Sequence, residues 1–194
     1  MVKSSKKIKI PKSKDENYWA IFEAVIRLDF IKGPMAWKIS DIARTSKISR
    51  PLIYYYFGNS KEHIMQTAVQ FLGEEYFGLS ESRKSLWQEG KILESLLDTR
   101  KLCQRAPFVH FFYMTRRHMD SSIGEKLREF EERFFQKISQ FFPDADRDHV
   151  EALAAVMFGL VASPNLNDRG VIAAVDIIKR NLAFAPPGTR PQKI

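Results

Sequence analysis

The chain of 194 residues contains a single cysteine, Cys103, which excludes an intramolecular disulfide and fits a reducing compartment. No stretch approaches the roughly 18 consecutive apolar residues that a membrane-spanning helix needs. The N-terminal segment is basic, but it lacks the long apolar core of a secretory signal peptide. These absences favour a cytoplasmic protein with no membrane partner.

Residues suited to catalysis or metal binding are few and poorly spaced. The four histidines and the cysteine form no HxxxH or CxxC pair, and the interval from Cys103 through His110 to His118 is too loose for a zinc signature. There is no glycine-rich phosphate loop and no GxSxG sequence. The sequence therefore predicts no catalytic residue, no metal site and no cofactor, and an enzyme is disfavoured.

Positive charge is concentrated in the first third of the chain. Residues 1–64 hold 13 Lys and Arg against 6 Asp and Glu, whereas residues 65–194 hold the remaining 18 and 17. The excess of seven positive charges in residues 1–64 would attract phosphate backbones regardless of base sequence. The alternative interpretation of this charge is a solvated basic tail that binds no nucleic acid. The first 14 residues contain six lysines and no acid, and they predict a disordered arm that tracks phosphates or enters the minor groove.

Two short helices joined by a tight turn are predicted within residues 38–57. Ile39, Ile42 and Ala43 recur at helical spacing and give the first helix one apolar face. Ser49 is expected to cap the second helix, with Pro51 in its first turn. Helices this short need a third element to pack against, and a preceding helix is expected to end near residue 31. This arrangement predicts a helix-turn-helix, whose second helix enters the DNA major groove.

The helix-turn-helix and the segments on either side of it contain a set of residues with a characteristic spacing: Ala24, Phe30, Gly33, Ile42, Ala43, Ile48, Ser49, Tyr54, Tyr56, Phe57, Ser60, Lys61 and Glu62. With these residues, the run from Ile21 to Ile64 resembles the N-terminal DNA-binding domain of TetR-type transcriptional regulators. Three places depart from the family pattern, and at one of them Gly58-Asn59 inserts a residue before Ser60-Lys61-Glu62. Ser46-Lys47 replaces the usual Ala-Gly of the turn, which must form without glycine's freedom at positive φ, and Lys38 replaces a capping threonine.

Individual DNA contacts can be assigned within this segment. Arg50 is expected to pair with guanine O6 and N7, and Pro51 and Tyr55 to offer apolar contact to thymine methyl groups. Tyr56 is expected to pack inside the small domain. The residues expected to hold phosphates, which fix register without reading sequence, are Lys38, Lys47, Ser49, Tyr54 and Lys61.

The rest of the chain is predicted to be helical, because strand-like alternation is nowhere sustained. Helices are expected at about 60–77, 85–103, 107–119, 122–142, 146–163 and 168–184. The fold class is therefore all-α, with a three-helix DNA-binding domain followed by a helical effector-binding and dimerisation domain. The expected divisions are a disordered basic arm at 1–14, the DNA-binding domain at 15–59, the helical domain at 60–184 and a disordered tail at 185–194.

Two residue sets are candidates for ligand binding and for dimer formation. An aromatic and Met-rich set either fills a core or lines a pocket for a small apolar effector: Trp87, Phe108, Phe111, Phe112, Met114 and Phe134. A small and apolar set on the last two helices suits either a monomer core or a homodimer interface: Ala155, Phe158, Gly159, Ala162, Val171, Ala174 and Ile178.

The family resemblance favours the pocket and the homodimer. It also implies a ligand-responsive repressor that binds a palindromic double-stranded DNA operator, although the residues leave activation open. The alternative function is a basic helical protein that binds nucleic acid without sequence preference or effector control. Arg116, Arg117 or His118 can meet an anionic group of an effector if the helix turns them inward, but exposure to solvent is the simpler expectation.

Overall fold

The computed structural model describes residues 14–181, and these contain ten helices and no strand, which confirms the all-α prediction. The predicted arm up to residue 13, the tail, and the last residues of the predicted helix at 168–184 lie outside the described residues. The helices are α1 (Lys14–Lys32), α2 (Ile39–Ser46), α3 (Arg50–Phe57), α4 (Lys61–Tyr76), α5 (Glu81–Gln88), α6 (Ile92–Arg105), α7 (Phe108–Arg116), α8 (Ser122–Phe141), α9 (Arg147–Ala162) and α10 (Asp168–Asn181).

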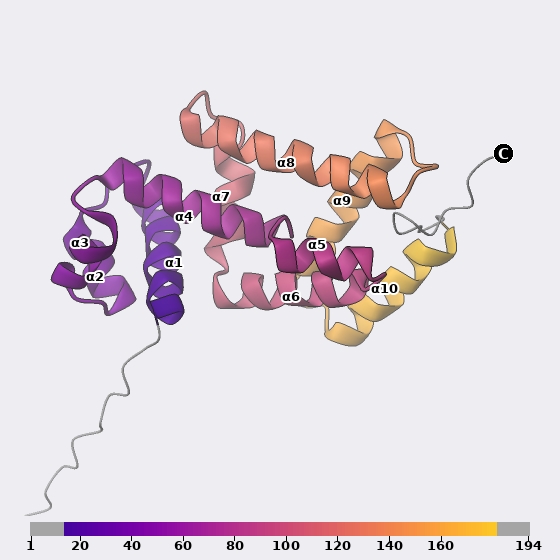
Figure 1. Cartoon of the computed structure of the whole chain (residues 1–194), viewed down its shortest axis with the longest axis horizontal. Helices are drawn as coiled ribbons and strands as arrows, with labels where there is room; N and C mark the ends of the chain where they lie inside the picture. The colour runs from indigo at the N-terminus through magenta and orange to yellow at the C-terminus, as the bar shows by residue number, and fades with distance from the viewer. Residues whose placement is uncertain (1–13, 182–194) are drawn as a thin grey trace, which may run out of the picture.

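The helices are arranged along an elongated molecule (Figure 1). Helices α1, α2 and α3 form one end, and α10 lies at the other. Helix α4 runs from the α1–α3 group toward α5, and it packs against α1, α6 and α8. Helix α7 also packs against α1, so two separate elements of the C-terminal part touch the first helix. No helix of the described residues is long and apolar enough to cross a membrane.

One continuous apolar core runs through both ends of the molecule. At the α1–α3 end its fully buried members include Ile21, Ile42 and Ile53, which come from three different helices. Burial of a side chain of this size contributes about 1.5–3 kcal/mol to the stability of the fold. Packing against α1 therefore supplies the stability that α2 and α3 lack as isolated short helices. Beyond α4 the core is largely aromatic, with Phe77 and Phe130 almost completely buried.

The prediction of a single helix at 85–103 is wrong, because the chain turns between α5 and α6. Gly90 has a φ of 76°, and its N–H donates to the carbonyl of Trp87. The N–H of Lys91 donates to the carbonyl of Leu86. These two bonds form a Schellman motif, which ends a helix at a residue with positive φ and favours glycine there.

Gly73 lies against Phe130 of α8, and α4 continues through this glycine without a break. A Cβ atom at this position would lie 2.5 Å from Cε2 of Phe130, which is too close for any side chain. The glycine therefore serves helix packing. Helix α4 ends only at Tyr76, and Gly78 follows with a φ of 62°.

Candidate DNA-binding and effector sites

The turn between α2 and α3 forms without glycine. Lys47 takes the left-handed conformation, with φ 59° and ψ 27°. The buried Ser46 hydroxyl donates to the carbonyl of Ile42 over 2.8 Å and accepts from the N–H of Ile48 over 3.2 Å. The side chain of Ser46 thus supplies local hydrogen bonds across the turn, while Lys47 bears the strained backbone.

Asp41 organises the start of α2 in place of a capping threonine. Its carboxylate accepts from the Lys38 N–H at 2.9 Å, from the Lys32 ammonium at 2.7 Å and from the Arg44 guanidinium at 2.7 Å. The hydrogen bond from Lys32, followed by that from the Lys38 backbone, lowers the pKa of Asp41. Lys38 occupies the N-cap position without a side-chain capping bond, and Asp41, three residues later, supplies the reciprocal bond of a capping box by accepting from the Lys38 N–H.

The outward face of α3 carries the residues that were predicted to meet DNA. Ile53 and Phe57 are buried beneath it, whereas Arg50, Pro51, Tyr54 and Tyr55 are exposed (Tyr55 by 82%). Lys38, Lys47 and Ser49 are exposed as well.

Ser49 occupies the N-cap position of α3 with an extended backbone, but its side chain makes no capping hydrogen bond. The prediction that Ser49 is the N-cap is therefore confirmed in position, but the capping hydrogen bond from its hydroxyl is absent. Its exposed position beside Arg50 leaves the hydroxyl at the solvent-facing start of α3.

Lys61 and Tyr56 are engaged within the protein. The half-buried Lys61 donates its ammonium to the carbonyl of Met35 and lies 5.1 Å from the ring centre of Trp37. Tyr56 packs on Tyr18 with ring centres 4.9 Å apart, which is the packing role expected from the sequence.

Arg44 is a cation of this region that the sequence-based assignment of DNA contacts missed. Its side chain is 77% exposed in the last turn of α2, close in sequence to Lys47. The sequence did indicate that Arg44 is exposed. Ile42 belongs to the apolar face of this helix, and Arg44 lies three residues after Asp41, at the spacing of an ion pair on the outer face.

The six aromatic and Met residues proposed for an effector are not gathered in one cavity. Trp87, Phe112 and Phe134 are buried, Phe108 is half-buried, and Phe111 and Met114 are about half exposed. Trp87 and Phe134 line a common cavity, together with Phe77 and Lys137, and its volume is about 10 Å³. The other residues of the set lie on α7.

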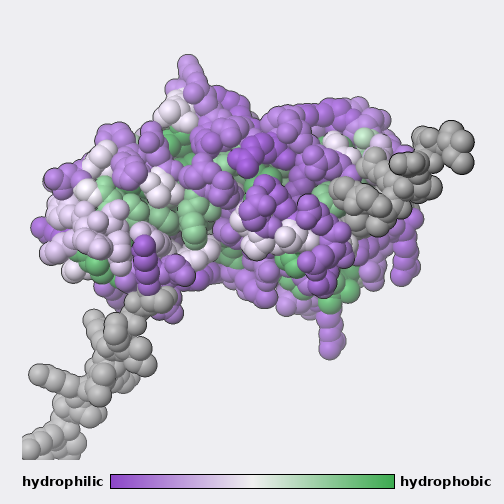
Figure 2. Space-filling view, viewed as in Figure 1, coloured by the Kyte–Doolittle hydropathy of each residue, from purple (hydrophilic) through white to green (hydrophobic). Residues whose placement is uncertain are grey.

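Two aromatic side chains of α7 contact Phe30, near the C-terminal end of α1. The rings of Phe108 and Phe111 lie 5.7 and 6.0 Å from that of Phe30. On the face shown in Figure 2, hydrophobic residues reach the surface along α1 and beside α4, and most of the remaining surface is hydrophilic.

Two larger cavities flank α7. One of about 370 Å³ is lined by residues of α6, α7 and α9, including Phe111, and another of about 370 Å³ is lined by residues of α7, α8 and α9, including Met114. His110 lines both, and its Nδ1 lies 2.7 Å from the hydroxyl oxygen of Tyr76 on α4. Burial lowers the pKa of His110 and raises that of Tyr76. These cavities thus adjoin the end of α4.

The residues proposed for a dimer interface differ in exposure. Ala155 and Gly159 are exposed, Val171 is fully buried, and the other four are half-buried: Phe158, Ala162, Ala174 and Ile178. Three further apolar side chains on the same two helices are 40–61% exposed: Val156, Ile172 and Ile177. The outer faces of α9 and α10 are therefore substantially apolar.

Comparison with known proteins identifies the N-terminal unit. Residues 21–68 match the family model described as bacterial regulatory proteins, tetR family. The chain is 30% identical over 131 residues to the HTH-type transcriptional repressor Rv3405c of Mycobacterium tuberculosis, and the match covers 61% of this chain and 69% of that relative. The HTH-type transcriptional regulator Mb3439c of Mycobacterium bovis matches to the same extent. No solved structure matches the chain. With the helix-turn-helix of α2 and α3, these similarities show that the chain belongs to the TetR family and is a DNA-binding transcriptional regulator.

Proposed function

We propose that the protein is a dimeric, ligand-responsive repressor that binds a palindromic or near-palindromic operator. The observation that carries this proposal is the exposed face of α3, on which Arg50, Pro51 and Tyr55 stand clear of a buried apolar back. One such helix reads only a few base pairs, so useful specificity needs two copies related by a two-fold axis. Repression agrees with the name of the relative from Mycobacterium tuberculosis.

Within the proposed complex, Arg50 reads guanine and Pro51 and Tyr55 contact thymine methyl groups. Lys38, Lys47, Ser49 and Tyr54 hold phosphates, and the exposed Arg44 is a further candidate for this role. Lys61 keeps two ammonium hydrogens after donating to Met35, so it can hold a phosphate without leaving its place.

The dimer is proposed to form through the outer faces of α9 and α10. Exposed Val156, Ile172 and Ile177 would lose contact with water there, beside the small residues Ala155 and Gly159. Small residues allow helices to approach closely, and apolar side chains around them supply the area that an obligate interface needs. Val171 belongs to the monomer core and would support this face from within.

The proposed division of labour follows the chain: residues 15–59 bind DNA, and residues 60–184 bind the effector and form the dimer. Helix α4 joins the two parts, and α7 touches α1 directly. An effector that favours the arrangement unable to bind DNA must lower operator affinity, and the operator must lower effector affinity by the same factor. The protein would act in the cytoplasm and catalyse no reaction.

The experiment that tests this function is footprinting of the full chain on the DNA flanking its own gene. We expect one protected region containing two inverted half-sites, with protection resistant to excess scrambled DNA. Sedimentation should show a dimer both free and on DNA. Uniform protection that scrambled DNA abolishes would instead support the non-specific basic nucleic-acid-binding protein.

A further inference from the structure

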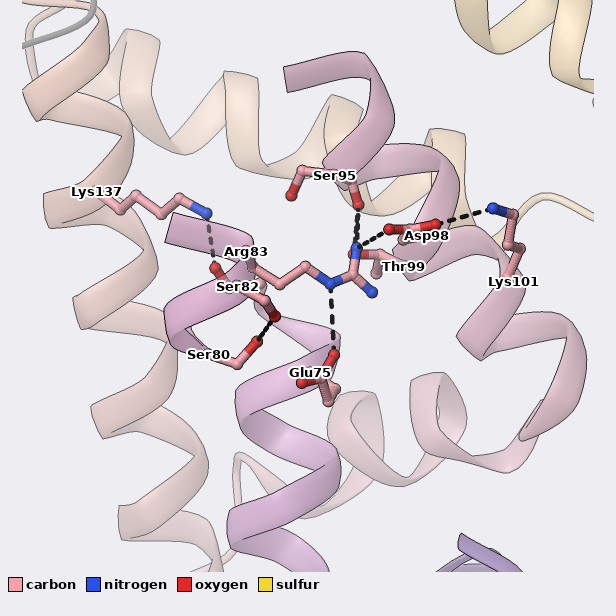
Figure 3. Close-up of polar contacts among 10 residues, drawn as sticks. Glu75, Ser80, Ser82, Arg83, Ser95, Asp98, Thr99, Lys101 and Lys137 are labelled. Atoms are coloured by element: carbon pink, nitrogen blue, oxygen red, sulfur yellow. Dashed lines mark hydrogen bonds and ion pairs between the residues drawn. The ribbon is translucent and has the colours of Figure 1, made fainter. Parts of the chain in front are cut away.

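A buried lysine interrupts the apolar face of α8. Lys137 follows Phe134 by three residues and precedes Phe141 by four, and only 6% of it is exposed. Its ammonium donates to the carbonyl of Gly78 over 2.7 Å and lies 4.1 Å from the ring centre of Trp87. Figure 3 shows Lys137 reaching from α8 toward the turn after α4, where Arg83 of α5 also lies.

The positive charge of Lys137 has no carboxylate partner within 4 Å among the described residues, whereas its cationic neighbours do. Arg83 pairs with Glu75 at 3.4 Å and with Asp98 at 3.7 Å, and Lys84 pairs with Glu81 at 2.7 Å. Burial, with repulsion from Arg83 and Lys84, lowers the pKa of Lys137 to about 7. A buried ammonium without a counter-charge is costly to the fold, so an anion beside it would be strongly favoured.

Lys137 also lines two hollows. One is a groove of about 200 Å³ between α5 and α8, lined by cationic, amide and apolar side chains and by no carboxylate, among them Lys84, Gln88, Arg133, Gln136 and Gln140. The other is the small cavity of about 10 Å³ that Trp87 and Phe134 line. The indole N–H of Trp87 is buried and has no hydrogen-bond partner within the described residues.

We propose that the groove between α5 and α8 binds a small organic monocarboxylate, with its carboxylate on Lys137 and its apolar body between Trp87 and Phe134. A single negative charge fits because Lys84 and Arg133 already face Glu81 and Glu129. The amides beside Lys137 and the indole N–H supply further donors to carboxylate oxygens.

Binding at this place acts on the end of α4. The small cavity must widen to admit an apolar body, and the carboxylate would bind the same ammonium that donates to the carbonyl of Gly78, so the two contacts are joined through Lys137. Gly78 follows directly on α4, whose other end begins beside α3. The inference rests on the proposed effector control, and it assigns the class of effector and the residue that recognises it.

The test is calorimetric titration of the full-length protein with octanoate and with the neutral octanamide. We expect octanoate to bind at least tenfold more tightly, and Lys137→Met to remove that preference while octanamide binding persists. Lys126→Met, a substitution of a half-buried lysine that pairs with Glu129 on the same helix, should keep the preference. Equal affinity for the two probes, no octanoate binding at millimolar concentration, or an unchanged preference in Lys137→Met would overturn the proposal.

A second measurement separates this site from the proposed control of DNA binding. Operator affinity of the unmodified protein and of Lys137→Met is measured with and without octanoate. Release of the operator by octanoate only when Lys137 is present supports both proposals. Lys137-dependent octanoate binding that leaves operator affinity unchanged supports the site and refutes effector control through it.

Discussion

Arg116 of α7 holds Asp29 of α1, although 87 residues separate them in the chain. The guanidinium donates from Nε to Oδ2 of Asp29 over 3.1 Å and from Nη2 to its backbone carbonyl over 2.8 Å. The other carboxylate oxygen accepts from the N–H of Met35 at 2.7 Å and from the indole N–H of Trp37 at 3.3 Å. One buried carboxylate thus fixes both α7 and the segment that leads into α2.

Removal of Arg116 should therefore destabilise the protein strongly. Arg116→Met leaves the Asp29 carboxylate, which is 3% exposed, without its cation, and we expect a loss of about 3 kcal/mol in the free energy of unfolding by urea. Arg128→Met removes an arginine that is exposed, and it should cost less than about 1 kcal/mol.

The double variant Asp29→Asn/Arg116→Met tests whether loss of the Arg116–Asp29 ion pair causes the loss of stability. Because the neutral amide that replaces the carboxylate needs no counter-charge, Arg116→Met should cost clearly less in that background than in the unmodified protein. Equal costs in the two backgrounds would place the effect of Arg116 elsewhere.

Replacement of Lys47, the strained residue of the turn, should increase stability and weaken DNA binding. Lys47→Gly should raise the free energy of unfolding by about 1 kcal/mol, since glycine adopts a φ of 59° without steric cost. If Lys47 holds a phosphate, the same change should weaken binding to all DNA and lower the salt slope by about 1. Lys47→Asn, which also tolerates this conformation, should weaken binding equally.

Periodicity along the sequence was sufficient to predict the helix-turn-helix. Ile42, Ile53 and Phe57 repeat at helical spacing, and each is buried as the pattern required. The break at Gly90 was missed although glycine gave a local signal, because the apolar pattern of the following helix resumes almost at once. The spacing of apolar residues therefore predicted most of the helices and most of the side chains that they bury.

Contacts between distant elements could not be predicted in this way. Nothing near Arg116 in the sequence indicates that its partner is Asp29, since the pair depends on how α7 packs against α1. The aromatic residues of α7 and α8 were placed on the correct helices, whereas Trp87 was assigned to a helix that continued through Gly90. Periodicity also does not say that Phe111 faces solvent while Phe112 is buried among other helices. Lys137 did leave a signal, because it lies within the apolar spacing of α8.

Substitutions on the exposed face around α3 should separate base reading from phosphate contact. Arg50→Ala should cost about 1–3 kcal/mol of binding free energy on the cognate operator and little on scrambled DNA, so base preference relaxes. Lys38→Ala should weaken both by a similar factor. Titration of each variant against both DNAs at fixed salt provides the measurement, and equal losses for Arg50→Ala would count against its contact with guanine.

The burial of Lys137 predicts how stability depends on pH. Its pKa falls from an ordinary value of 10.5 to about 7 in the folded protein. Between these values the folded state binds fewer protons than the unfolded state, so this lysine makes the free energy of unfolding rise with pH. Lys137→Met removes that dependence and also the penalty of burying the amine, so the variant should be the more stable one at pH 7.

The comparison of the two proteins isolates the effect of Lys137. Their difference in unfolding free energy should shrink by about 1 kcal/mol per pH unit between pH 8 and 10, because one proton corresponds to a slope of roughly 1.4 kcal/mol per unit. The surrounding charged groups, Arg83, Lys84, Glu75 and Asp98, are present in both proteins, so their own titration largely cancels. Urea unfolding of both proteins across this range measures the difference, with Lys126→Met as the control that should run parallel to the unmodified protein. A difference independent of pH would mean that Lys137 keeps its charge in the folded state through this range.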